Sequence, residues 1–140
     1  MTERHMLDIV HHQNPVTLTP ADSAREACAL MSKHGVGAIL VVDENRQLAG
    51  IFTGRDAVAR IVARGLDATK TPLKEVMTAA PITMQPGSTA SDALLLMQDG
   101  GFRHVPVVDG ERVIGIVSKG DFRGLEQAHL DEQTELWERV

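Results

Sequence analysis

Short apolar runs and stretches of helical periodicity alternate along the chain in an order that occurs twice. In the first copy, an apolar run at 16–18 precedes residues 24–34, where apolar side chains recur at helical spacing and predict one buried face. Two apolar, largely β-branched runs follow at 38–42 and 48–52, and the polar turn between them predicts a hairpin. A helix over 56–65 completes the order β-α-β-β-α.

The second copy repeats this order. Residues 82–109 align without gaps with residues 16–43, and the hairpin that follows is one residue shorter in its turn. Two copies are too few for a solenoid, so the pattern predicts an α+β fold built from two similar subdomains packed against each other. The second set of predicted elements comprises strand 82–84, helix 90–100, strands 105–108 and 113–117, and helix 121–130.

Domain boundaries follow from the repeat. We expect an N-terminal arm, two repeats joined by an ordered connector with a short amphipathic segment, and a C-terminal helix with several large apolar residues. These parts are assigned to residues 1–13, 14–65, 66–80, 81–128 and 129–140.

The ends of the first helix in each copy carry matching signals. Ser23 and Thr89 are each followed three residues later by an acid, the pattern of a capping box at a helix N-terminus. Gly35 and Gly101 stand where each helix should end, and they predict a left-handed C-terminal cap.

A second hydroxyl-x-x-acid pattern occurs in the duplicated motifs GIFTGRD (50–56) and GIVSKGD (115–121). One interpretation is helix capping alone, because Thr53 or Ser118 begins a helix with an acid three residues on. The other uses the same geometry for binding: a helix N-terminus attracts phosphate, and a carboxylate can accept hydrogen bonds from both hydroxyls of a ribose. The motif alone leaves both interpretations open.

Composition excludes several function classes. The formal charge of −5, with three Phe, one Trp and no Tyr, argues against nucleic acid as a partner. No apolar run approaches the length of a membrane span or a signal peptide, so we expect a cytoplasmic protein.

Cys28 is the single cysteine and fits a core position, and the adjacent His11 and His12 lack a third metal ligand. We expect no metal site and, without an acid–base pair beside a nucleophile, no enzyme activity.

Three segments together resemble a tandem pair of CBS domains (the cystathionine β-synthase type, or Bateman module). They are HGVGAILVVD…LAGIFTGRD, TPLKEVMTAAPITMQPGSTASDAL and GFRHVPVVDGERVIGIVSKGD. The resemblance implies a pseudo-twofold disc with two clefts that commonly hold AMP, ADP, ATP, NAD or S-adenosylmethionine. It implies a non-catalytic sensor without a required cofactor, which forms a homodimer and adjusts an unidentified partner protein.

In relatives of this type each cleft is shared between the repeats, with an aspartate on the ribose. Carried over by the resemblance, the first cleft would use Thr53, Arg55, Asp56, Pro81, Ile82, Arg103, His104 and Val105. The second would use Ser118, Lys119, Asp121, Asn14, Pro15, Val36, Gly37 and Ala38.

The two expected clefts differ in charge. The first has two arginines, and guanidinium groups hold phosphate better than the lone lysine of the second. We therefore expect tighter binding of a phosphorylated adenosine ligand at the first. The alternative function is a ligand-free structural module, in which the caps are only caps and the chain dimerises or docks on a partner enzyme.

Overall fold

The computed structural model describes residues 3–11 and 13–122, which divide into two compact units. We call the unit built from residues 14–82 and 111–113 the first unit, and the unit built from the rest of the described chain the second unit. Each unit contains the helix and most of the hairpin of one sequence repeat.

A four-stranded sheet forms the first unit, in the order β1-β2-β3-β4. The β1–β2 pair is parallel, as expected across a helical crossover, whereas β2–β3 and β3–β4 are antiparallel. The predicted hairpin is therefore confirmed as β2 and β3. The strands are β1 (Thr17–Leu18), β2 (Ala38–Val42), β3 (Leu48–Thr53) and β4 (Thr78–Ala79).

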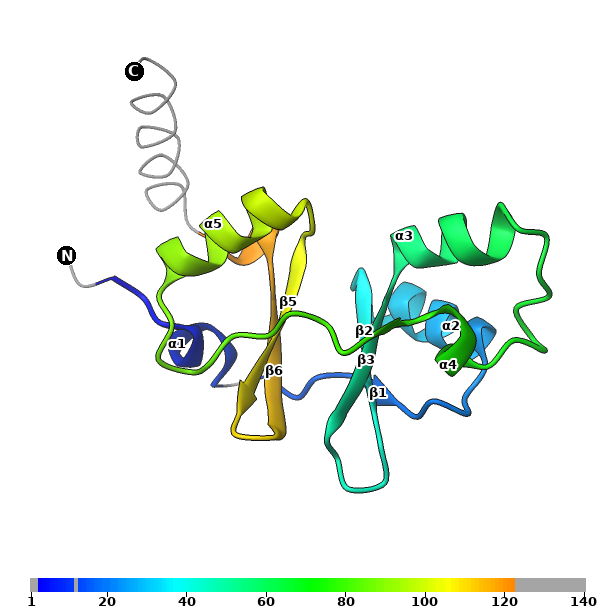
Figure 1. Ribbon diagram of the computed structural model, residues 1–140, viewed down its shortest axis with the longest axis horizontal. Helices are drawn as coiled ribbons and strands as arrows, with labels where there is room; N and C mark the ends of the chain where they lie inside the picture. The colour runs from blue at the N-terminus through cyan, green and yellow to red at the C-terminus, as the bar shows by residue number, and fades with distance from the viewer. Residues whose placement is uncertain (1–2, 12, 123–140) are drawn as a thin grey trace, which may run out of the picture. The chain divides into compact units, whose positions relative to one another are not determined.

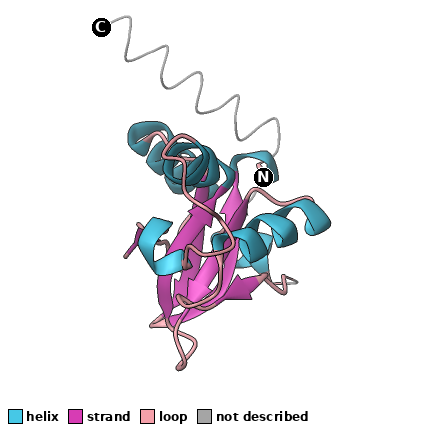
Figure 2. Cartoon of the chain, turned by 90° about the vertical axis from the view of Figure 1, so that its right-hand side faces the viewer, coloured by secondary structure: helices cyan, strands magenta, loops and turns pink. Residues whose placement is uncertain are grey.

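Helices cover the strands of the first unit, as Figure 2 shows in cyan beside magenta. α2 (Ala24–His34) ends at Gly35, whose φ of 64° confirms the predicted left-handed cap. A short α3 (Gly54–Asp56) leads into η1 (Ala57–Val62), which has π-helical geometry, so the helix predicted over 56–65 begins earlier and ends sooner. α4 (Leu73–Val76) lies in the predicted connector. The core is formed by Ala24, Ala27, Met31, Ile39, Val41, Phe52, Ile61, Leu73 and Val76.

The second unit has the same plan with fewer strands. The strand predicted at 82–84 is reduced to a single parallel bridge between Met84 and Val107. Most of the helix predicted at 121–130, and all of the one at 129–140, lie outside the described residues. The elements are α1 (Met6–Val10), α5 (Ala90–Gly100), β5 (His104–Asp109), β6 (Arg112–Ser118) and the 3-10 turn η2 (Lys119–Asp121).

The short helix before each repeat packs into the core of the other repeat. α1 precedes the first repeat, yet Met6 and Val10 are fully buried among second-unit residues. α4 precedes the second repeat, yet Leu73 and Val76 are fully buried in the first-unit core. Figure 1 shows both relations, with blue α1 beside α5 and β6, and green α4 beside α2 and β3.

This packing explains why each duplicated motif starts with glycine. A Cβ on Gly50 would lie 2.6 Å from Met77 Sδ and 2.7 Å from the Thr78 carbonyl oxygen. A Cβ on Gly115 would lie 2.6 Å from Val10 Cβ. Only glycine allows the covering segment to approach the last strand of the hairpin so closely.

Candidate functional site

The first motif forms a reciprocal capping box at the end of β3. Thr53 donates to Asp56 Oδ2 from its backbone N–H over 3.0 Å and from its hydroxyl over 3.1 Å. The Asp56 N–H returns a hydrogen bond to Thr53 Oγ1 over 3.1 Å. Since α3 follows β3 directly, these bonds satisfy backbone donors that the first helical turn would otherwise leave open. Thr53 and Asp56 therefore cap the helix as predicted, and ligand binding at the same turn stays a prediction.

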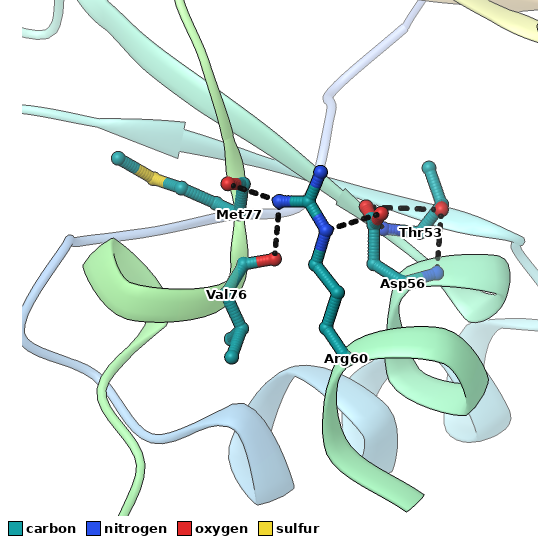
Figure 3. Close-up of polar contacts among 5 residues, drawn as sticks. All are labelled: Thr53, Asp56, Arg60, Val76 and Met77. Atoms are coloured by element: carbon teal, nitrogen blue, oxygen red, sulfur yellow. Dashed lines mark hydrogen bonds and ion pairs between the residues drawn. The ribbon is translucent and has the colours of Figure 1, made fainter. Parts of the chain in front are cut away.

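Arg60, on η1, completes this arrangement from the opposite side (Figure 3). Its Nε lies 3.7 Å from Asp56 Oδ1, an ion pair beyond hydrogen-bonding distance. Its Nη1 donates to the carbonyl oxygens of Met77, over 2.8 Å, and Val76, over 3.2 Å. One guanidinium thus joins the Asp56 carboxylate to the C-terminal end of α4.

The second motif forms a similar turn after β6, but with a more exposed acid. Asp121 Oδ2 accepts from the Ser118 N–H over 2.7 Å and from the Ser118 hydroxyl over 3.2 Å. Asp121 is exposed, whereas the side chain of Asp56 is only 15% exposed. Arg4 also reaches this turn, because its Nη2 donates to the Asp121 carbonyl oxygen over 2.9 Å.

Within each unit, the turn lies beside the start of the first hairpin strand. The Gly54 N–H donates to the Gly37 carbonyl over 3.1 Å, and Ala38 pairs with Thr53 in the sheet. In the second unit the Lys119 N–H donates to the Arg103 carbonyl over 2.9 Å. The start of β2 was assigned to the second turn, and the start of β5 to the first. Within its own unit, each of these strand starts lies beside the other turn, namely β2 beside Thr53 and Gly54 and β5 beside Lys119.

His104, at the start of β5, lies in the electrostatic field of the second turn. Burial lowers the pKa of its imidazole below the ordinary 6.5, and the Arg103 guanidinium lowers it further, whereas the Asp121 carboxylate raises it. Burial is the largest of these effects, so the neutral imidazole is the form that the fold favours.

The expected site residues fall in both units, and their grouping into two shared sites stays a prediction. Ala38 and Val105 are buried in strands, whereas Val36 and Ile82 leave 42% and 55% of their surface exposed. Half-buried residues of the set are Pro15, Thr53, Asp56, Pro81, His104 and Ser118. The remaining members are exposed, namely Asn14, Gly37, Arg55, Arg103, Lys119 and Asp121.

Sequence reasoning missed Arg60 and Arg4. Arg60 stands four residues after Asp56 in a predicted helix, and that spacing places two side chains on one face, so a signal was present. Arg4 had no such signal, because its contact joins residues 117 positions apart in the sequence.

The described part of the chain contains neither a metal-binding cluster nor a membrane-spanning helix. Residues 3–11 and 13–122 contain no group of three His, Cys, Asp or Glu side chains placed to hold a metal ion. Within the same ranges, none of the helices combines the length and apolar character needed to cross a membrane.

The comparison with known families decides the identity of the fold. The model of the CBS domain matches residues 7–63 and again residues 73–126. The chain belongs to the CBS domain family. The predicted tandem CBS pair with its mixed α/β fold is thereby confirmed.

Several relatives resemble this CBS pair over most of its length. The CBS domain-containing protein YhcV of Bacillus subtilis is 39% identical over 105 residues, which are 75% of this chain and 74% of YhcV. The chain spans only 19% of CBSCBSPB5 of Arabidopsis thaliana, which is also 39% identical.

Solved structures extend the comparison to the fold. The CBS-domain containing protein ATU1752 from Agrobacterium tumefaciens is 33% identical with a TM-score of 0.77, covering 84% of this chain and 94% of its own. The CBS domain pair of protein MJ0100 is 30% identical with a TM-score of 0.77, covering 86% and 93%. That structure is a complex with 5′-methylthioadenosine and S-adenosyl-L-methionine.

Proposed function

We propose that this CBS pair is a non-catalytic regulatory module that binds an adenosine compound, with Asp56 and Asp121 each holding a ribose. The ligand is AMP, ADP, ATP or NAD, or a sulfur-containing adenosine compound like those in the MJ0100 complex. Binding would change the module's affinity for a partner protein. The ligand can do so only if it binds two arrangements of the module with different affinity.

The hydrogen-bond capacity of each aspartate carries this proposal. An ionised carboxylate offers about four acceptor sites. The capping turn uses one oxygen of each, and Oδ2 of Asp56 accepts two bonds from Thr53. Among residues 3–11 and 13–122, the contact of Asp56 Oδ1 is the Arg60 ion pair at 3.7 Å, which leaves lone pairs for the two hydroxyls of a ribose. A carboxylate can therefore cap its turn and bind a sugar at the same time.

Two exposed aliphatic side chains of the expected sites support an adenine-bearing ligand. Val36 and Ile82 belong to the expected sites, and both are exposed although they are large aliphatic residues. A purine that covers such side chains removes apolar surface from water, which contributes about 25 cal/mol for each Å². Exposed aliphatic groups in the expected sites fit a base attached to a sugar better than they fit a free sugar.

The charge ranking of the two sites depends on which turn Arg103 and His104 serve. If they complete the first site across the repeats, a phosphorylated ligand binds there more tightly. If they act at the turn beside which they lie in the second unit, Asp121 belongs to the tighter site. Substituting the aspartates one at a time discriminates between these arrangements.

Calorimetry and thermal unfolding with AMP, ATP, NAD, S-adenosylmethionine and 5′-methylthioadenosine test the proposal. A ligand at 100 times its dissociation constant stabilises the native state by about 2.7 kcal/mol, a clear rise in Tm. Asp56→Ala and Asp121→Ala should each remove binding at one site. If none of these compounds raises Tm or releases heat, the module does not sense adenosine compounds, and the ligand-free interaction module is the better interpretation.

One observation supports self-association, which both candidate functions include. On η1, Val58 is 64% exposed and Val62 is 73% exposed, four residues apart on one helical face. A second copy of the chain is the partner we propose for this face, which would give the expected homodimer. Light scattering on Val58→Asp and on the unmodified chain tests it, and equal masses would contradict it.

A further inference from the structure

Arg60 links three elements of the first unit that are far apart in the sequence. It extends from η1, pairs with the acid of the α3 turn at 3.7 Å, and donates to two carbonyls at the end of α4. Its side chain is 40% exposed, while that of Asp56 is 15% exposed. Figure 3 shows the guanidinium between the carboxylate and the Val76 and Met77 carbonyls.

These contacts restrict the guanidinium strongly. The last carbonyls of a helix lack partners within it, and a cation placed there is favoured by the helix dipole. α4 is itself held in place, because Leu73 and Val76 are fully buried. The guanidinium is planar and carries its donors in a fixed fork. With Nη1 bound to two carbonyls, Nε has little freedom to move away from Asp56.

The second repeat lacks this arrangement in its sequence. GIFTGRDAVAR aligns with GIVSKGDFRGL, so Leu125 stands where the first repeat has Arg60. Leucine has no charge and no donor for a carboxylate. The two repeats therefore differ in sequence at the position of Arg60, although both aspartates cap a turn in the same way.

We propose that Arg60 is a positioning residue for ligand binding at Asp56, and that it couples occupancy of that carboxylate to the end of α4. The inference rests on the proposed function. The ion pair holds the carboxylate in one orientation, with Oδ1 oriented for the ribose hydroxyls, so less side-chain freedom is lost when the ligand binds. Movement of Oδ1 toward a ribose is transmitted through the guanidinium to the Val76 and Met77 carbonyls.

The test uses 5′-methylthioadenosine, which has the ribose hydroxyls but no charge, so loss of the Arg60 cation cannot weaken it by direct attraction. Affinities are measured on full-length Asp121→Ala protein, which leaves only the first site. Adding Arg60→Met should weaken binding by about 3- to 10-fold, the effect of immobilising one side chain. Arg64→Met is the matched control, since Arg64 is an exposed arginine four residues further along.

A double-mutant cycle separates positioning from a general loss of structure. In an Asp56→Asn background, which keeps an acceptor oxygen but removes the charge that pairs with Arg60, Arg60→Met should have little further effect on affinity, because the ion pair through which it acts is gone. Hydrogen exchange gives a second measurement: the ligand should change protection of the Met77 amide, which donates to the Leu73 carbonyl, only while Arg60 is present. If Arg60→Met does not fold, Arg60→Lys keeps the charge without the fork and should bind with intermediate affinity.

The outcomes distinguish the two proposals. If the Asp121→Ala protein does not bind 5′-methylthioadenosine, ribose binding at Asp56 fails and the Arg60 proposal fails with it. If it binds and Arg60→Met leaves the affinity unchanged or makes it tighter, only the Arg60 proposal is overturned. An equal loss in the Asp56 and Asp56→Asn backgrounds would overturn it as well, since Arg60 would then act on the fold alone.

Discussion

Replacing Met6 by alanine tests how far α1 belongs to the second unit. The Met6 side chain is fully buried in that unit's core, and its backbone N–H donates to the Ser88 carbonyl over 2.8 Å. Leu7, the next residue on the same short helix, is 49% exposed. The two side chains are similar in size, and both residues favour helix about as well, so Leu7→Ala is a matched control.

The expected loss follows from the atoms removed. Met→Ala deletes three heavy atoms, and each buried group contributes about 0.8 kcal/mol, which gives about 2.4 kcal/mol for transfer alone. The cavity that remains brings typical losses to about 2–5 kcal/mol. Leu7→Ala should cost less than about 1 kcal/mol, because half of that side chain is already in water.

Urea unfolding followed by circular dichroism measures both losses, and hydrogen exchange places them in the structure. The Ile116 amide donates to Gln13 Oε1 over 2.9 Å, so loosening α1 should accelerate its exchange. If residues 1–13 were an arm outside both repeats, the two substitutions would have similarly small effects. Equal losses for Met6→Ala and Leu7→Ala would therefore refute the packing argument.

Two more predictions concern the second unit. Gly115→Ala should destabilise the protein by about 1–3 kcal/mol, because the added Cβ would lie 2.6 Å from Val10 Cβ. Gly87→Ala, with nothing within 4 Å of its Cβ, is the control for this urea experiment, and equal losses would contradict the argument. The pKa of His104 in the folded protein is below 6.5, so the unfolded chain binds the imidazole proton more readily. The free energy of unfolding should therefore decrease as the pH is lowered through 6.5 and below. His104→Asn should reduce that dependence, and Asp121→Asn should lower the pKa of His104 further in an NMR titration; no movement would show that the two groups do not interact.

The repeat could be predicted from the sequence because its signals are local. Capping residues, helical periodicity and β-branched runs depend on neighbours within a few positions, and they located α2, α5 and both hairpins. α1 has only five residues, which is too short for a helical periodicity to stand out. Val10 of α1 lies against Gly115 of β6, more than 100 residues away, and a local pattern does not record such a contact.

The candidate site likewise combines a local contact, which the sequence predicts, with contacts that no local pattern predicts. The cap between Thr53 and Asp56 spans three residues, so the motif predicted it from spacing alone. The partners of Arg60 on α4 are backbone carbonyls, which every residue has, and no side-chain pattern marks them. Sequence reasoning therefore found the carboxylate but not the group that orients it.

The duplicated turn shows why helix capping and ligand binding are not exclusive alternatives. A cap uses one carboxylate oxygen and fixes the acid at a strand-to-helix turn. That constraint places the second oxygen in a defined position, which is also what a ribose receptor requires. Selection for a stable turn thus provides a prepositioned acceptor without additional residues. Differences between the two repeats then arise from whatever contacts the second oxygen, and in the first repeat that contact is Arg60.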